Sequence, residues 1–280
     1  MSNCETCPSK GSCNEESCGK TLPKFGNIKN IIGVISGKGG VGKSTVTGIL
    51  AIQLAKMGYK VGVLDADITG PSMPRIFAVN EERAKMEPID GQEQAVRLFP
   101  VESSLGIKIM SLNLLMEKED HPVIWRGPMI TGVLNQMYAD SEWGELDYLL
   151  IDMPPGTGDI ALTVMQTIPL SGMVVVSTPQ DMVSMIVKKV IYMVEKLNIK
   201  LLGTVENMSY VQCGKCGERI KIFSKKSASE HAEYLGIPLL EEMPIDLELV
   251  DSLENGKFED YIKQSDTYET LIENTLNRLR

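Results

Sequence analysis

The residues whose types and spacing suggest chemistry most clearly are the nine at 37–45, which read GKGGVGKST. They match the pattern G-x-x-x-x-G-K-[ST] through Gly37, Gly42, Lys43 and Ser44. Glycines let successive backbone N–H groups turn towards phosphate oxygens, the lysine reaches the β- and γ-phosphates, and the hydroxyl binds Mg²⁺. The pattern therefore predicts a loop that binds a nucleoside triphosphate, made by Gly37, Lys38, Gly39, Gly40, Val41, Gly42, Lys43, Ser44 and Thr45.

Lys38 is a second lysine in this loop, and the motif itself does not require it. Two interpretations stay open. Lys38 is either a solvated surface lysine or a cation that meets phosphate only when another subunit supplies it.

Three aspartates follow apolar runs that read as strands. Asp65 and Asp67 close the stretch LDAD, and Asp152 follows LLI. In an open α/β sheet the ligand lies beyond the carboxyl ends of the strands, next to a phosphate loop. Any one of these residues alone is better explained as a helix N-cap, but together they favour a nucleotide–Mg²⁺ site.

A second chemical feature is the C-x-x-C pair Cys213 and Cys216. Two thiolates are half of a tetrahedral metal site, and no further Cys or His lies within the next dozen residues. His231 comes next and is expected to be an ordinary surface residue on a helix over 227–235. An iron–sulfur site, half of a zinc site and a redox dithiol all remain open.

The other four cysteines are Cys4, Cys7, Cys13 and Cys18, within a segment that lacks hydrophobic periodicity. Residues 1–27 are predicted to be a Cys-rich flexible tail, and residues 28–280 the folded domain. The four thiols could hold a cluster or zinc, or could bind nothing.

Apolar runs alternate with amphipathic segments along the rest of the chain, which predicts a doubly wound, mostly parallel α/β sheet. Strands are expected at 31–36, 60–67, 97–112 in two pieces, 148–153, 172–178, 201–208 and 238–244. Helices are expected at 43–57, 127–140, 159–168, 181–197, 227–235 and 262–280.

Composition limits the partners. The net charge is −9 and aromatic residues make up only 5%, which argues against a general nucleic-acid surface. No stretch reaches 18 apolar residues, and the polar N-terminus is not a secretory signal. We therefore expect a cytoplasmic protein with no membrane and no nucleic-acid partner, in which cysteines serve as metal ligands or redox thiols.

These motifs together resemble a known family. GKGGVGKST, with its extra lysine, is similar to the deviant Walker A loop of the class of P-loop NTPases that contains MinD and the nitrogenase iron protein. LDADITGPSMP (64–74), VIWRGPM (123–129), LLIDMPPGTGD (149–159), STPQD (177–181) and VENMSYVQCGKCGERIKIF (205–223) resemble the Mrp/ApbC branch, the ATP-dependent iron–sulfur cluster carriers. The likeness spans about residues 28–250.

The resemblance implies a homodimeric, slow ATPase that binds a 4Fe–4S cluster, interacts with assembly scaffolds and passes the cluster to apo-proteins. It implies that Lys38 reaches the partner subunit's nucleotide, that Asp67 positions the attacking water with Asp65 in support, and that Lys43 serves the phosphates. Asp152 would lie on the Mg²⁺ side, and Asn207 would contact adenine, although Asn207 is almost equally well explained as a polar residue that closes a strand.

A 4Fe–4S cluster takes four thiolates, and a C₂ dimer places two copies of the Cys213 and Cys216 pair about one axis. We therefore expect one cluster that bridges two subunits. Cys4, Cys7 and Cys13 are spaced like three ligands of an N-terminal ferredoxin-like cluster in eukaryotic relatives, but an upstream fourth ligand is missing, so a second cluster depends on Cys18.

One stretch departs from the pattern of the branch, and the sequence disfavours two other classes of function. After Phe223 the chain reads SKKSAS where the branch often has a glycine-rich loop. The alternative function is a MinD/ParA-type positioning ATPase with a zinc or redox C-x-x-C, but the balance of charges over 259–280 is wrong for an anionic surface. A nitrogenase-type electron donor would need cysteines in the middle of the chain, which has none.

Overall fold

The computed structural model describes residues 19–68, 70–89, 96–116 and 127–280. Most strands form one sheet, and β3 and β4 form a separate antiparallel pair. The strands are β1 (Phe25–Ser36), β2 (Val61–Asp65), β3 (Lys85–Pro88), β4 (Val96–Phe99), β5 (Val101–Glu102), β6 (Lys108–Met110), β7 (Glu142–Asp152), β8 (Gly172–Ser177), β9 (Leu201–Gln212), β10 (Arg219–Lys221) and β11 (Leu239–Pro244).

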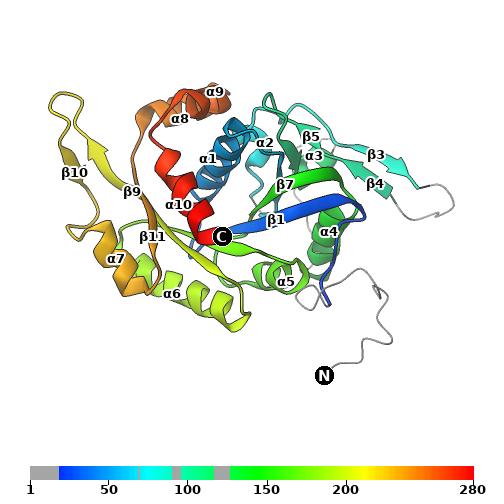
Figure 1. Ribbon diagram of the computed structural model, residues 1–280, viewed down its shortest axis with the longest axis horizontal. Helices are drawn as coiled ribbons and strands as arrows, with labels where there is room; N and C mark the ends of the chain where they lie inside the picture. Colours follow the sequence, from blue (N-terminus) through cyan, green and yellow to red (C-terminus); the bar gives the residue numbers. More distant parts are fainter. Residues whose placement is uncertain (1–18, 69, 90–95, 117–126) are drawn as a thin grey trace.

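Helices cover both faces of this sheet (Figure 1). One layer contains α1 (Lys43–Lys56), α2 (Met73–Ile76), α8 (Leu247–Glu254), α9 (Phe258–Gln264) and α10 (Glu269–Leu279). The other contains α4 (Gly127–Ala139), α5 (Asp159–Thr167), α6 (Asp181–Lys196) and α7 (Ala228–Leu235), while α3 (Leu112–Leu115) is a short turn beside β6.

The main sheet has nine strands among the described residues, in the order β10-β9-β8-β1-β7-β2-β6-β5, with β11 paired to β9. All pairs at its centre are parallel, and only β10 and β5 run antiparallel to their neighbours. This confirms the predicted doubly wound α/β fold. The carboxyl ends of β1, β2, β7 and β8 therefore meet at one edge, where such folds bind ligands.

The strand β1 positions the centre of that edge. Its second half, Ile31–Ser36, is fully buried between β7 and β8, as the continuous apolar run predicts. Its first half pairs with β7 from Phe25 onwards, although the sequence there alternates too little to mark a strand. The strand begins six residues earlier than predicted because β7, which is also longer than predicted, supplies a partner.

Residues 19–27 belong to the domain rather than to the predicted tail. The Thr21 N–H donates to the Thr167 carbonyl at 2.8 Å, the Lys24 N–H donates to the Ala139 carbonyl at 2.8 Å, and β1 begins at Phe25. Residues 1–18, with all four N-terminal cysteines Cys4, Cys7, Cys13 and Cys18, lie outside the described residues.

The predicted C-terminal helix over 262–280 is wrong in its limits, because two helices, α9 and α10, divide this stretch. The hydroxyls of Tyr261 and Tyr268 both donate to the Asp246 carboxylate, at 2.7 and 2.6 Å, and fix the bend between them. None of the described helices combines the length and the apolar character that crossing a bilayer requires.

Candidate functional site

The loop between β1 and α1 has the backbone geometry that phosphate binding requires. Gly40 and Gly42 have φ of 77° and 83°, which an L side chain rarely adopts. A Cβ placed on Gly39 or Gly40 would meet no atom within 4 Å, so the loop faces open space there. No side chain caps the N-terminus of α1, which leaves its first N–H groups and its positive dipole end available to an anion.

Asp152 lies below this loop and is fully buried. Its two carboxylate oxygens accept hydrogen bonds from the hydroxyls of Ser44, at 2.7 Å, and Thr47, at 2.9 Å. The Lys43 ammonium lies 2.8 Å from the same carboxylate and is itself only 6% exposed. The structure therefore brings Asp152 to Lys43 and Ser44, from which it is separated by more than a hundred residues in the sequence.

The donor set beside Lys43 fits a magnesium ion. The Ser44 hydroxyl and the Asp152 carboxylate are adjacent oxygen donors, the ligand type that Mg²⁺ prefers. Lys43 balances the buried charge of Asp152 when no other cation is present. When bound, the ion would offset negative charge on the phosphates.

Asp67 and Asp65 have different environments at the end of β2. The Asp67 carboxylate lies 3.7 Å from the Lys43 ammonium and is partly exposed, at the mouth of the site. Asp65 is buried and accepts hydrogen bonds from the N–H groups of Asp67, Ser72 and Met73 and from the Ser111 hydroxyl. Asp65 thus holds the segment that carries Asp67.

The pKa of Asp65 is raised to about 7. Burial is the largest cause, and the neighbouring negative charge of Asp152 adds to it. Lys43 and the Met73 N–H act in the opposite direction.

Lys38 is a half-buried residue of the loop, and its ammonium donates to the Gln180 side-chain oxygen at 3.0 Å. Its backbone carbonyl accepts a hydrogen bond from the Ser36 hydroxyl at 2.9 Å. A Cβ on Gly37 would lie 3.0 Å from the backbone nitrogen of Val187 in α6, so the close approach of α6 favours glycine there. Among the described residues Lys38 is thus held by a neutral partner.

Asn207 contacts the loop from the side, on β9. Its amide donates to the Val41 carbonyl at 2.9 Å, and its own oxygen accepts from the Met208 N–H at 2.9 Å. A Cβ on Gly42 would come within 2.1 Å of the Asn207 nitrogen, so only glycine allows this contact. Asn207 therefore supports the loop, and the adenine contact stays a prediction.

Cys213 and Cys216 lie on the turn of the hairpin formed by β9 and β10, which extends from the sheet at its β9 edge (Figure 1). The turn is closed by two backbone hydrogen bonds, from the Cys213 N–H to the Glu218 carbonyl at 2.8 Å and from the Gly217 N–H to the Cys213 carbonyl at 2.9 Å. Cys216 is exposed and Cys213 is half-buried.

The turn favours the thiolate form of Cys213. Its pKa is lowered by the backbone N–H groups of Cys216 and Lys215 and by the Cys216 side chain. Within the part of the chain that the structure describes, no group of three or more His, Cys, Asp or Glu side chains could hold a metal. A four-thiolate site at this hairpin therefore needs ligands from elsewhere.

His231 is not the surface residue that the sequence suggested. It is buried, with its Nδ1 against the Glu206 carboxylate and its Nε2 3.4 Å from the Ser224 hydroxyl. The sequence also did not assign Thr47 and Gln180. Thr47 lies one helical turn after Lys43 on the buried side of α1, and Gln180 lies within the motif STPQD. Their positions relative to the motifs could therefore have indicated that both lie at the site.

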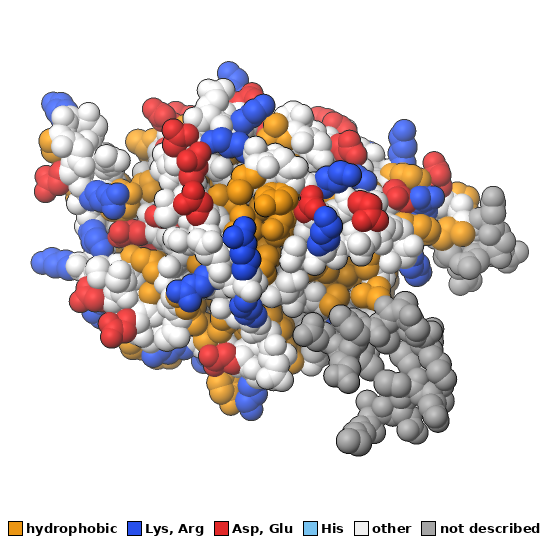
Figure 2. Space-filling model, viewed as in Figure 1, with side chains coloured by type: hydrophobic (Ala, Val, Ile, Leu, Met, Phe, Trp, Pro, Cys, Tyr) orange, Lys and Arg blue, Asp and Glu red, His pale blue; other side chains and the backbone are white. Residues whose placement is uncertain are grey.

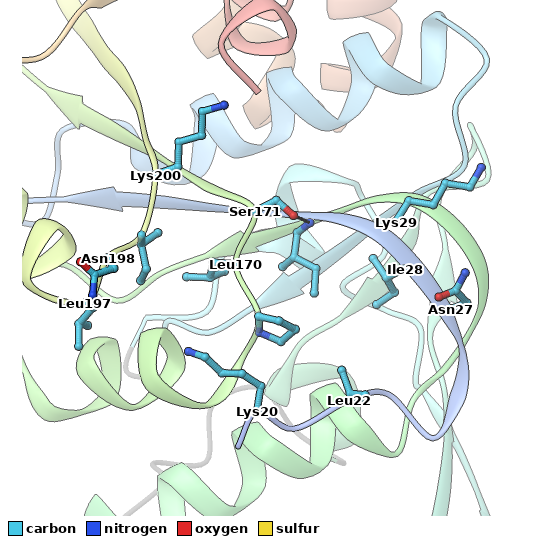
Figure 3. Close-up of a pocket in the computed structure, with 13 residues that line it drawn as sticks. Lys20, Leu22, Asn27, Ile28, Lys29, Leu170, Ser171, Leu197, Asn198 and Lys200 are labelled. Carbon is cyan, nitrogen blue, oxygen red and sulfur yellow. Dashed lines mark hydrogen bonds between the residues drawn. The ribbon is translucent and has the colours of Figure 1, made fainter. Parts of the chain in front are cut away.

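A separate cavity of about 820 Å³ lies at the opposite edge of the sheet, before β1, β8 and β9 (Figure 3). Its three lysines are committed to other groups: Lys20 to the Met165 carbonyl, Lys29 to Asp147 and Lys200 to the Leu279 carbonyl. In Figure 3, Lys29 and Lys200 point away from the cavity. It contains none of the candidate site residues.

Known proteins resemble this chain over nearly its whole length. An iron–sulfur cluster carrier protein of Clostridium perfringens is 60% identical, covering 98% of this chain and 99% of the relative. A protein of the same name from Methanocaldococcus jannaschii is 42% identical, covering 90% and 87%.

Solved structures agree with the sequence relatives. A nucleotide-binding protein of Archaeoglobus fulgidus, in complex with ADP and with cobalt found in it, is 43% identical with a TM-score of 0.72, over 86% of this chain and 91% of that one. The cell division ATPase MinD of Pyrococcus furiosus, at 20% identity and a TM-score of 0.60 over 90% and 99% of the chains, shares the fold.

The profile of the NUBPL iron-transfer P-loop NTPases, within the ParA group, matches residues 27–279. This match covers the phosphate loop, the Asp152 site and the cysteine hairpin. The chain therefore belongs to the family of iron-transfer P-loop NTPases.

Proposed function

We propose that this protein is an ATP-dependent carrier that binds a 4Fe–4S cluster as cargo and passes it to apo-proteins. The observation that carries the proposal is a phosphate loop and an exposed C-x-x-C hairpin in one domain, joined through β9, in a chain of the iron-transfer family. Relatives at 60% and 42% identity are named iron–sulfur cluster carrier proteins.

The nucleotide site supports ATP hydrolysis to ADP and phosphate. Loop N–H groups and Lys43 would bind the phosphates, and Ser44 with Asp152 would hold Mg²⁺. Asp67, near Lys43 at the mouth, would orient the attacking water. Among the described residues the Lys38 ammonium donates to the neutral Gln180 side chain. Lys38 would release this contact and turn to phosphate when a partner subunit supplies it.

The cluster would be bound by Cys213 and Cys216 from each of two subunits. One hairpin offers two thiols, and a C₂ axis doubles that number without any further ligand from the chain. Transfer would then proceed by exchange of these thiolates for cysteines of the recipient, with no net change in the oxidation state of the cluster. Exposure of Cys216 gives a recipient access.

The residues Cys4, Cys7, Cys13 and Cys18 would hold a second cluster, and assembly scaffolds would load the protein in the cytoplasm. These parts of the proposal rest on the sequence, because residues 1–18 lie outside the described residues.

The arrangement of α10 disfavours a positioning ATPase that binds membranes. Its apolar residues Leu271, Ile272 and Leu276 are buried in the hydrophobic core. Its exposed surface carries charges of both signs, and Figure 2 shows Lys/Arg and Asp/Glu side chains interleaved over one face of the molecule. An anionic membrane attracts clustered positive charge.

The test is transfer of a cluster to an apo form of a 4Fe–4S enzyme under anaerobic conditions. Reconstituted wild-type protein should restore the enzyme's activity, and the variants Cys213→Ser and Cys216→Ser should not. Equal restoration by both variants, or by free iron and sulfide at the same concentration, would contradict a carrier function of this hairpin.

A further inference from the structure

The strand β9 connects the two chemical sites directly. Asn207 contacts the phosphate loop through the Val41 carbonyl, and Cys213 lies six residues further on, directly after the last residue of the same strand. At about 3.3 Å per residue these six residues span roughly 20 Å. A displacement of the loop by nucleotide therefore acts on the strand that carries the cysteines.

This strand is irregular between the two sites. Glu206 pairs with Glu242 of β11, and Tyr210 pairs with Pro244. Between these two pairs β9 advances by four residues while β11 advances by two, which is a β-bulge in β9. Met208, within the irregularity, has φ of 56°, which is uncommon for a residue other than glycine. Left alone, such a bulge would bend and absorb a displacement rather than transmit it.

A series of polar contacts, buried at Ser209 and Glu206 and partly exposed at Glu242 and Lys221, holds this bulge in place. The Ser209 hydroxyl lies 2.8 Å from the Glu206 carboxylate and 2.7 Å from the Glu242 carboxylate. His231 of α7 contacts the other oxygen of Glu206, and the ammonium of Lys221 of β10 lies 3.2 Å from Glu242. This series of contacts thus extends from Glu206, next to Asn207 in β9, to Lys221 in β10, the second strand of the cysteine hairpin.

The charges in this series of contacts depend on one another. Ser209 is 1% exposed and Glu206 is 2% exposed. A hydroxyl has one hydrogen, so Ser209 donates to only one of the two carboxylates at a time. His231 contacts the Glu206 carboxylate, and the Lys221 ammonium contacts the Glu242 carboxylate. Because a buried charge that loses its partner is costly, the four elements β9, β10, β11 and α7 resist separate movement.

The hairpin is also fixed at its base. Tyr210 pairs with Lys221 of β10, and its carbonyl accepts the Ile245 N–H at 2.7 Å. The Arg219 guanidinium lies 4.5 Å from the centre of the Tyr210 ring. Motion of β9 at Ser209 therefore reaches the hairpin as a whole.

We propose that Ser209 is a positioning residue that makes the bulge of β9 rigid. Nucleotide bound in the phosphate loop then changes the position and accessibility of the Cys213 and Cys216 thiols. This inference rests on the proposed function, since it assigns how ATP would act on the cargo site. Glu206, Ser209, Glu242 and Lys221 would couple the residues that bind nucleotide to those that bind the cluster, without binding either ligand.

The experiment measures the rate at which iodoacetamide alkylates Cys213 and Cys216 in the full, metal-free chain, resolved by peptide mass spectrometry. Rates are compared with and without Mg²⁺ and a non-hydrolysable ATP analogue. In the wild type the analogue should change the rate about fivefold or more, in the range of typical couplings between sites. In Ser209→Ala this ratio should fall to below roughly twofold, while affinity for the analogue stays unchanged.

Ser141→Ala is the matched control, because Ser141 is fully buried and also donates a hydrogen bond, to the Met137 carbonyl, far from the hairpin. It should keep the wild-type ratio. If Ser209→Ala does not fold, Lys221→Met should lower the ratio and Lys221→Arg should restore it. Both substitutions lie on a partly exposed residue of the hairpin.

A wild-type ratio near one, or an unchanged ratio in both Ser209→Ala and Lys221→Met, would overturn the inference. Iron content after reconstitution separates this failure from failure of the carrier function. If the Ser209→Ala variant binds as much iron as the wild type but its alkylation no longer depends on nucleotide, the result supports coupling through Ser209. A wild type that binds no iron but shows the ratio would contradict only the proposed function.

Discussion

Replacing Asp152 by asparagine should destabilise the nucleotide-free protein strongly, because among the described residues its carboxylate makes the closest ion pair with the buried Lys43 ammonium, at 2.8 Å against 3.7 Å for Asp67. The carboxylate is fully buried, with hydrogen bonds from Ser44 and Thr47 and an ion pair at 2.8 Å. The carboxamide keeps the size of the side chain and removes its charge. The change therefore isolates the electrostatic contribution.

The magnitude follows from the burial of both partners. Removing one member of a buried ion pair typically costs about 3–5 kcal/mol, since the other charge stays behind without compensation. For a domain of this size that corresponds to a fall in Tm of roughly 6–20 °C. Thr47→Val, which removes one hydrogen bond to the same carboxylate and leaves the ion pair, should cost only about 1.5–3 kcal/mol.

The assay is thermal unfolding without nucleotide, with ATP hydrolysis measured in parallel. Asp152→Asn should also lower hydrolysis by about 10²–10³-fold, as expected when one preorganised charge is removed from a reacting centre. Adding ATP should restore part of its lost stability, because phosphate gives Lys43 a new partner. An Asp152→Asn protein that melts with the wild type, or that loses less stability than Thr47→Val, would refute this account of the Lys43–Asp152 pair.

Three further predictions concern other parts of the molecule. Lys38→Ala should leave equilibrium ATP binding largely intact and cut hydrolysis by about 10³-fold, as a cation supplied across a subunit interface would; lost binding with normal turnover of bound ATP would make it a ligand in its own subunit. Asp65 has a pKa of about 7 in the folded protein against 3.8 in the unfolded chain, so the folded state retains a proton between these values and stability should fall as pH rises from 4 to 7. Melting curves at pH 5 and pH 8 should show this loss in the wild type and a smaller one in Asp65→Asn, and equal slopes would contradict it. Removing residues 1–18 should leave Tm within about 2 °C and ATPase activity unchanged, since the hydrogen bonds of Thr21 and Lys24 are kept, and a collapse of Tm would show that the segment supports the fold.

The sequence was sufficient for those parts of the site that local patterns encode. The phosphate loop needs glycines, a lysine and a hydroxyl at fixed spacing, and the strand ends of a parallel sheet bring Asp67 and Asp152 to it. The parallel pairing of the central strands also follows from the alternation of strands and helices, whereas the order of the strands was not predicted.

The parts that could not be predicted depend on partners distant in the chain. His231 looks like a surface residue on its helix, and only β9 supplies the Glu206 carboxylate that lets it be buried. The first half of β1 has no apolar run, and its partner β7 makes it a strand. The bend between α9 and α10 depends on Asp246, which lies in the loop before α8.

The most direct test of the central claim is anaerobic reconstitution of the protein lacking residues 1–18, with iron, sulfide and mass measured on the same sample. Two iron atoms per monomer on a dimer are predicted, with both the iron and the cluster-dependent dimer lost in Cys213→Ala and in Cys216→Ala. Four iron atoms on a strict monomer, or stoichiometric zinc in protein isolated without oxygen, would contradict a cluster shared between two hairpins.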